Sequence, residues 1–148
     1  MKKTCFMFGH AFIPEDITES LLEAVRMHYH VYGVRVFVAG MYGDFDRMAK
    51  ETLIFLQKEL PEMEALLLTP YHPQVSKGRL PDGMDGTLYP EGMENAPPRL
   101  AIVRANQYMV RKADTVICYV NRVGNTKKLL EAAEKRRNLV ITNLAAPT

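Results

Sequence analysis

Cysteine is scarce in this chain, and long apolar runs are absent. The 148 residues include two cysteines, Cys5 and Cys118, which form no Cys-x-x-Cys pair and lie in short apolar runs. We interpret both as buried, reduced thiols. No stretch approaches the ~18 consecutive apolar residues of a membrane-spanning helix, so we expect no membrane partner. The four histidines show no metal-ligand spacing, and we expect neither a metal nor another cofactor.

A secretory signal and a second domain are not expected either. Gly9-His10 ends the apolar run at residues 4–8 before the core of a signal peptide is complete, which favours a cytoplasmic protein. With 47% apolar and 24% charged residues, the composition is that of an ordinary globular chain. A chain of this length buries about two thirds of the surface that its unfolded form exposes. We therefore expect residues 1–148 to form one domain.

Charge is unevenly distributed along the chain. Residues 1–98 hold 9 Lys+Arg against 14 Asp+Glu, net −5, whereas residues 99–148 hold 10 against 3, net +7. Such a split suggests an anionic partner. Most charges have a local use in acidic first turns and basic last turns of predicted helices. Lys127 and Lys128 are the exception, because cations at a helix start are disfavoured by the dipole by ~0.3–1 kcal/mol each.

Short apolar runs alternate with amphipathic stretches. The runs at 4–8, 34–39, 65–69, 115–120 and 139–142 are typical of strands buried on both faces. Helical spacing follows at 17–31, 44–60, 98–113 and from about Asn125. The alternation predicts an α/β protein with a Rossmann-like three-layer α/β/α fold and a mainly parallel, five-stranded sheet. We expect the first strand to be central, with the fourth beside it.

The segment 71–97 interrupts this rhythm. It contains four prolines and four glycines, so no regular element of ordinary length fits there. Loops of this length are usually functional or disordered. Its position after the third strand favours a long loop or lid over the carboxyl edge of the sheet, and a disordered excursion is the alternative.

Ligands of open parallel sheets bind beyond the carboxyl ends of the strands. The candidate ligand-binding residues are therefore those that follow strands: Gly9, His10, Gly40, Gly43, Asp46, Gly124, Asn125 and Thr126. Glycine at such a place allows close approach of the backbone to a ligand. His10 is either a donor to phosphate, an acid or base, or a simple turn residue.

Residues 124–126 are the most informative of these. A helix start offers unpaired N–H groups and the positive end of the dipole, and a bound anion would turn the two following lysines into favourable neighbours. We hypothesise that a phosphate lies on the backbone of Gly124, Asn125 and Thr126; two solvated lysines at an exposed helix start are the alternative. Asp46 is a candidate for ribose hydroxyls, or else a helix cap.

The predicted third helix adds two candidates. The guanidinium of Arg99 suits phosphate, although a solvated helix face is the commoner fate of such a residue. Asn106 falls near the apolar stripe, where an amide needs a partner. No Gly-x-Gly-x-x-Gly fingerprint follows the first strand, which disfavours an ordinary dinucleotide dehydrogenase.

Taken in order, these motifs resemble a known family. The motifs are Cys5-Phe6-Met7-Phe8-Gly9-His10, Gly40-x-x-Gly43-x-Phe45-Asp46, Tyr89-Pro90-Glu91-Gly92, Arg99, Asn106-x-x-Met109 and Ala113-Asp114. The series, spread over residues 4–143, is similar to the YpsA-like branch of the SLOG superfamily, the Rossmann-like group that also holds the DNA-processing protein DprA and the LOG hydrolases. The resemblance implies a nucleotide or nucleotide-derived ligand at the carboxyl edge of the sheet.

The chain departs from the hydrolases of that group at one place. Their Pro-Gly-Gly-x-Gly-Thr-x-x-Glu loop is replaced by Val123-Gly124-Asn125-Thr126, and Leu129 stands where the glutamate falls. Glu91, in the segment 71–97, is the carboxylate that would serve if the protein were an enzyme.

These features predict a sensor or regulatory module that binds a small nucleotide-like phosphate ligand. One alternative is a hydrolase that cleaves the N-glycosidic bond of a nucleoside 5′-monophosphate, with Glu91 as the catalytic carboxylate. Binding of single-stranded nucleic acid ranks third. The basic half offers only Tyr108 and Tyr119 for stacking, so we do not expect nucleic acid as a partner. A homo-oligomer is left open.

Overall fold

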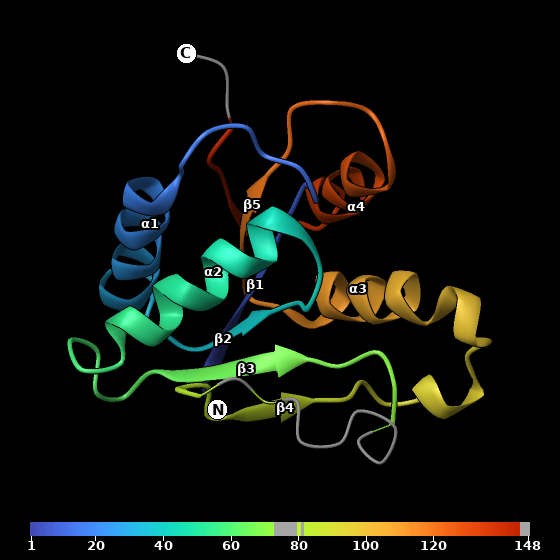
Figure 1. Cartoon of the computed structure of the whole chain (residues 1–148), viewed down its shortest axis with the longest axis horizontal. Helices are drawn as coiled ribbons and strands as arrows, with labels where there is room; N and C mark the ends of the chain where they lie inside the picture. Colours follow the sequence, from blue (N-terminus) through green and yellow to red (C-terminus); the bar gives the residue numbers. More distant parts are fainter. Residues whose placement is uncertain (73–79, 81, 146–148) are drawn as a thin grey trace.

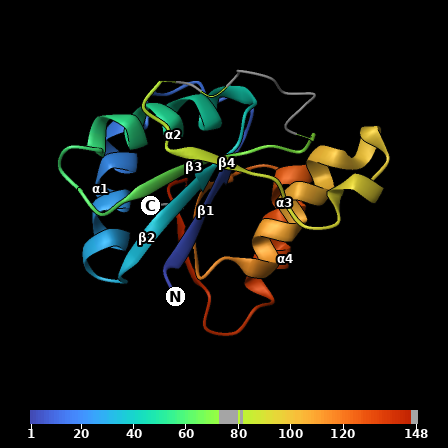
Figure 2. The same ribbon diagram turned by 90° about the horizontal axis from the view of Figure 1, so that it is seen from below.

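A parallel sheet lies between two pairs of helices in the computed structural model, which describes residues 1–72, 80 and 82–145 (Figure 1). Helices α1 (Thr18–His30) and α2 (Gly43–Leu56) pack on one face of the sheet. Helices α3 (Ala101–Lys112) and α4 (Asn125–Glu134) pack on the other, and the view from below separates the two pairs clearly (Figure 2). The predicted three-layer, Rossmann-like α/β arrangement is confirmed.

The sheet has the strand order β4-β3-β2-β1-β5-β6, and every neighbouring pair is parallel. The strands are β1 (Lys3–Gly9), β2 (Val34–Ala39), β3 (Glu64–Leu68), β4 (Gly86–Leu88), β5 (Thr115–Tyr119) and β6 (Val140–Asn143). Strand β1 is central, with the fourth predicted strand, β5, beside it, as the sequence indicates. The carboxyl ends of β1, β2 and β5 therefore meet at one edge.

The expected number of five strands is wrong, because β4 adds a sixth at the edge next to β3. Three residues are too short to show an apolar period. Backbone contacts define the strand instead: Asp85 N–H donates to the Ala65 carbonyl at 2.8 Å, and Thr69 N–H donates to the Leu88 carbonyl at 2.9 Å. Strand β4 and the short 3-10 turn η1 (Met93–Asn95) thus occupy part of the segment expected to be a loop. Residues 73–79 and 81 of that segment lie outside the described residues.

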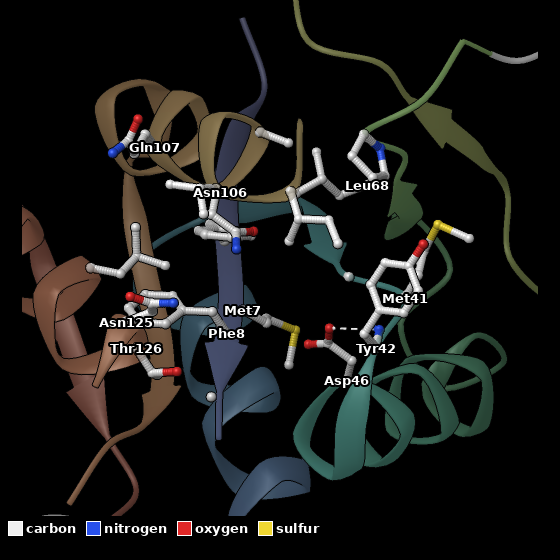
Figure 3. Close-up of a pocket in the computed structure, with 18 of the residues that line it drawn as sticks. Met7, Phe8, Met41, Tyr42, Asp46, Leu68, Asn106, Gln107, Asn125 and Thr126 are labelled. Atoms are coloured by element: carbon white, nitrogen blue, oxygen red, sulfur yellow. Dashed lines mark hydrogen bonds between the residues drawn. The ribbon is translucent and has the colours of Figure 1, made fainter. Parts of the chain in front are cut away.

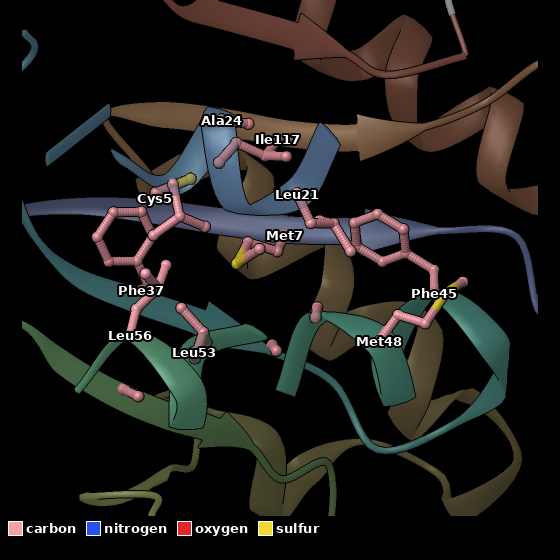
Figure 4. Close-up of a cluster of buried hydrophobic side chains, with 14 of the residues drawn as sticks. Cys5, Met7, Leu21, Ala24, Phe37, Phe45, Met48, Leu53, Leu56 and Ile117 are labelled. Carbon is pink, nitrogen blue, oxygen red and sulfur yellow. The ribbon is translucent and has the colours of Figure 1, made fainter. Parts of the chain in front are cut away.

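Successive side chains of β1 pack alternately into two separate hydrophobic cores, one on each face of the sheet. Cys5 and Met7 point toward α1 and α2, where they pack with Phe37, Leu53 and other fully buried side chains (Figure 4). Phe6 and Phe8 point the other way, toward α3 and α4. Each fully buried side chain of this size contributes ~1.5–3 kcal/mol. A central strand that is buried on both faces explains why the run at 4–8 is continuously apolar.

Helix α3 is preceded by a second 3-10 turn, η2 (Pro98–Leu100), which accounts for the predicted start at Pro98. Helix α2 ends at Leu56, four residues before the predicted end at Leu60. Both cysteines are buried. In the part of the chain that the structure describes, no helix is long and apolar enough to cross a membrane.

Candidate functional site

A cavity of about 240 Å³ opens at the carboxyl edge of the sheet, on the side of α3 and α4 (Figure 3). Its volume lies just below the range for small-molecule sites, ~300–1,000 Å³. Phe6, Phe8 and Leu68 belong to the core beneath α3 and α4 and form its apolar floor. The β2–α2 connection closes it on one side and the start of α4 on the other. We call this cavity the main pocket.

Six of the ten residues predicted to bind a ligand line the main pocket: Gly9, Gly40, Asp46, Asn106, Asn125 and Thr126. They come from β1, the β2–α2 connection, α2, α3 and α4, so segments far apart in the sequence meet here as the topology requires. The side chain of Asn106 projects from α3 into the pocket (Figure 3). Within the described residues its amide has no hydrogen-bond partner in the protein, which leaves two donors and an acceptor for a ligand.

The two helix starts at this edge differ in what their N–H groups bind. At the start of α2, Asp44 N–H donates to the Ala11 carbonyl at 2.7 Å and Phe45 N–H donates to the His10 carbonyl at 3.3 Å. The Asp44 carboxylate in turn accepts from Ile13 N–H at 2.9 Å. The loop after β1 therefore binds two N–H groups of this helix start, and Asp44 and Asp46 add negative charge in its first turn, which disfavours an anion there.

The start of α4 is open by comparison. Gly124 is its N-cap and provides no side chain, and its carbonyl accepts from Lys128 N–H at 3.2 Å. Across the described parts of the chain, the N–H groups of Asn125 and Thr126 have no recorded acceptor. Both residues line the main pocket together with Lys128. The cavity thus has unpaired donors and a cation at the positive end of a helix dipole, the arrangement that binds anions.

Asp46 is the carboxylate of the main pocket. Its Oδ2 accepts from Tyr42 N–H at 3.1 Å, and the backbone of Gly40 bonds it as well. Burial raises the pKa of the Asp46 carboxyl to about 6, and those backbone bonds and Lys50 offset only part of that effect. A half-buried carboxylate with spare lone pairs at the pocket wall can accept hydrogen bonds from hydroxyl groups.

Glycine at residue 9 serves packing. A side chain there would overlap the ring of Phe45, so the missing Cβ allows α2 to pack against the end of β1. Gly43 lies outside the pocket lining, where its φ of +92° and its contact with Ala11 form the entry to α2. Packing of α2 therefore requires both glycines.

His10 does not line the main pocket. Its side chain is buried, its Nε2 accepts from Asn121 N–H at 3.0 Å, and its ring meets that of Tyr119 edge-on. Burial and, next, Arg122 lower the pKa of the imidazole, so the ring is neutral at pH 7. These contacts assign His10 to the connection between β1 and β5.

Three further predicted residues also lie outside the lining. Gly124 caps α4 next to the pocket, and Arg99 is exposed on η2. Glu91 is exposed before η1 and lines neither this cavity nor the second one described below. Leu129, in contrast, lines the main pocket at the place where LOG hydrolases carry a glutamate.

The sequence reasoning missed part of the lining. The apolar wall of Ile102 and Val103 and the rim residue Tyr42 were not among the candidates. Tyr42 is 50% exposed, which is high for an aromatic side chain. The sequence does place Tyr42 between Gly40 and Gly43, in a loop that follows a buried strand, and this position could have indicated a residue of the site. In the described residues, no three His, Cys, Asp or Glu side chains are grouped in a way that could hold a metal ion.

The basic excess of the second half is concentrated on the helices that flank the main pocket. The ion pairs recorded in the described part of the chain all join residues between 2 and 64. Arg104 and Arg111 on α3 and Lys128 on α4 are exposed and have no carboxylate partner there. The α3–α4 side therefore keeps its positive charge.

Neither a family model nor a curated protein matches this chain. Among solved structures, the chain is similar to DNA processing protein A from Helicobacter pylori, a protein described for its mode of binding single-stranded DNA. The match has a TM-score of 0.60 and 16% sequence identity, and it covers 94% of this chain and 64% of that chain. This chain thus corresponds to less than two thirds of that protein's length.

This similarity corrects one expectation. Nucleic acid was set aside as a partner because the basic half has few aromatic side chains, yet a protein with this fold binds single-stranded DNA. The aromatic residues at the carboxyl edge, such as Tyr42, come from the acidic half of the chain rather than from the basic half. What the similarity shows of this chain is its fold, a Rossmann-like α/β fold of the type found in DNA processing protein A.

Proposed function

We propose that the main pocket binds a nucleotide, with the phosphate at the start of α4 and the ribose at Asp46. The observation that carries the proposal is the meeting of open N–H groups, Lys128 and a carboxylate around one cavity. Phosphate requires donors and positive charge, and ribose hydroxyls require an acceptor. Asn106 would then read the edge of the base against the apolar wall of α3.

The proposed role is a sensor or regulatory module rather than a hydrolase. Glu91, the carboxylate considered above for glycosidic cleavage, is exposed outside the pocket, and Asp46, the carboxylate that lines the pocket, is assigned here to the ribose. Leu129 supplies an apolar surface instead. Membership of the YpsA-like branch, which rests on the sequence motifs, and a cytoplasmic location, which rests on the short apolar run at residues 4–8, are part of this proposal.

Single-stranded nucleic acid is a second source of the same nucleotide unit. Two observations favour it: the similarity to a DNA-binding protein of the same fold, and the exposed cations Arg104, Arg111 and Lys128, which form no ion pair with any described residue. Phosphates of a strand outside the pocket would be neutralised by these cations, with affinity that falls steeply as salt rises. A free mononucleotide, in contrast, meets few of them and depends less on salt.

Calorimetric titration tests the proposal with AMP, ADP, ADP-ribose and a short single-stranded oligonucleotide. Lys128→Gln should weaken binding several-fold, because Lys128 lines the pocket. Lys127→Gln is the matched control, since it removes the same charge from the same helix turn outside the lining. Absence of binding by every probe at millimolar concentration, or equal losses in the two variants, would contradict the proposal. Release of free base from AMP would instead support the alternative function, hydrolysis of the N-glycosidic bond.

A further inference from the structure

A second cavity, of about 320 Å³, lies beside the main pocket. It is bounded by the end of β3, the residues after β4, the turns η1 and η2, and the start of α3. Pro70 lines both cavities, and Ala101 of the second cavity directly precedes Ile102 of the main one. The two cavities are therefore adjacent along the carboxyl edge.

The lining of the second cavity is aromatic. Tyr71, His72 and Tyr89 contribute their rings, and the rings of His72 and Tyr89 meet edge-on with centroids 5.8 Å apart. Tyr71 also lies close enough to Tyr42, on the rim of the main pocket, to raise the pKa of the Tyr42 phenol, second to the effect of burial. Tyr71 also directly follows Pro70, which lines both cavities, so each of the two adjacent cavities has aromatic side chains in its lining. Such surfaces stack bases irrespective of sequence.

The charges around this cavity suit a base rather than a phosphate. The one carboxylate among its described lining residues is Glu94, which repels phosphate but can accept a hydrogen bond from an exocyclic amino group. Arg99 directly follows the lining residue Pro98 and is exposed. Among the described residues it has no ion-pair partner. A cation at this edge suits a phosphate that passes outside the cavity.

We propose that the second cavity holds the base of a neighbouring nucleotide, so that the site takes a single-stranded segment of at least two nucleotides. The inference rests on the proposed function, because the first nucleotide occupies the main pocket. It adds a second subsite formed by Tyr71, His72 and Tyr89. The strand, rather than a free mononucleotide, is then the preferred ligand.

The test compares adenosine 5′-monophosphate with the 5′-phosphorylated adenine diribonucleotide in calorimetric titrations, because the first ribose of the dinucleotide keeps a 2′-hydroxyl for Asp46. Stacking of the second base should make the dinucleotide bind roughly tenfold more tightly. Tyr89→Ala should remove this gain and leave the affinity for the mononucleotide unchanged, whereas Tyr89→Phe should keep it. Tyr108→Ala is the control, because Tyr108 is also half-buried but lines neither cavity.

Two further measurements keep the outcome decisive. His72→Ala removes an exposed ring and should reduce the gain, and circular dichroism checks that the variant is folded. Equal affinities of the wild type for the two ligands, or equal losses of both in Tyr89→Ala, would overturn the second subsite while leaving the main pocket in place. The proposed function itself would be overturned if the wild type did not bind the mononucleotide and if Asn106→Ala left the affinity for the dinucleotide unchanged.

Discussion

The carboxylate of Asp46 occupies the space beside Gly40 that a side chain at residue 40 would fill. This contact places the carboxylate against the backbone that ends β2, where Tyr42 N–H also binds it. Glycine at residue 40 thus leaves room for the carboxylate of Asp46. The pair therefore links the backbone of the sheet edge to the proposed ribose site.

Gly40→Ala should displace the Asp46 carboxylate, because the added methyl group overlaps Oδ2. We expect a loss of ~1–3 kcal/mol in the free energy of unfolding, as for other overpacked sites, and weaker nucleotide binding. Gly86→Ala is the control, since its Cβ would make only an ordinary contact with Leu66 at 3.4 Å. Urea unfolding and titration of both variants check this. Equal stability of the two would show that the contact imposes no constraint.

Asp46→Asn should stabilise the protein at pH 7 and weaken its ligand binding. The carboxyl has a pKa of about 6 in the folded protein against about 3.8 in the unfolded chain, so its ionisation costs stability as pH rises through that window. Removing the charge should raise the free energy of unfolding at pH 7 by on the order of 1–3 kcal/mol. Thermal unfolding at pH 4 and pH 7 measures the difference. A variant less stable at pH 7 would contradict the assignment.

His28 should make the fold sensitive to acid in the opposite sense. Its ring is fully buried between Thr115 and Thr142, each 2.8 Å from one ring nitrogen, and burial lowers its pKa to about 4. A neutral native histidine loses stability as pH falls from about 6.5 to 4, by up to ~3 kcal/mol.

The contributions of Asp46 and His28 to the pH dependence of the free energy of unfolding therefore have opposite signs between pH 4 and 6 and partly cancel. The loss of stability on acidification should be steeper in Asp46→Asn than in the wild type, and it should flatten in His28→Gln. Unfolding curves at half-unit pH steps check both slopes. If the free energy of unfolding changed with pH in the same way in all three proteins, these opposite contributions of Asp46 and His28 would be refuted.

Gly43→Ala and Gly92→Ala separate steric overlap from backbone strain. Both glycines have φ near +90°, but a Cβ at residue 43 would lie 2.6 Å from Ala11 Cα, whereas residue 92 has nothing within 4 Å. Gly92→Ala should cost ~1–2 kcal/mol from the backbone alone. Gly43→Ala should cost clearly more and loosen the start of α2. Chemical denaturation of both variants measures this, and equal losses would contradict the contact with Ala11.

Much of the fold could be predicted, because β1, β2 and β5 are buried on both faces and their apolar runs are continuous. Strand β4 could not, since three residues show no period and its pairing with β3 depends on the backbone. The site was predictable where a residue broke a local rule, as Lys128 does at a helix start. Its apolar wall and the aromatic second cavity were not, because Ile102 or Tyr89 looks like any core residue until the tertiary structure leaves it facing a cavity.

Backbone amide NMR during titration with AMP tests the central claim most directly. We expect the N–H signals of Asn125 and Thr126 and the side-chain amide signal of Asn106 to shift together and saturate. The N–H signals of Asp44 and Phe45, already bound to the loop after β1, should stay nearly unchanged as an internal control. A phosphate site at α4 would be contradicted if the N–H signals of residues 125 and 126 did not shift at millimolar AMP. It would also be contradicted if the largest shifts occurred at the start of α2.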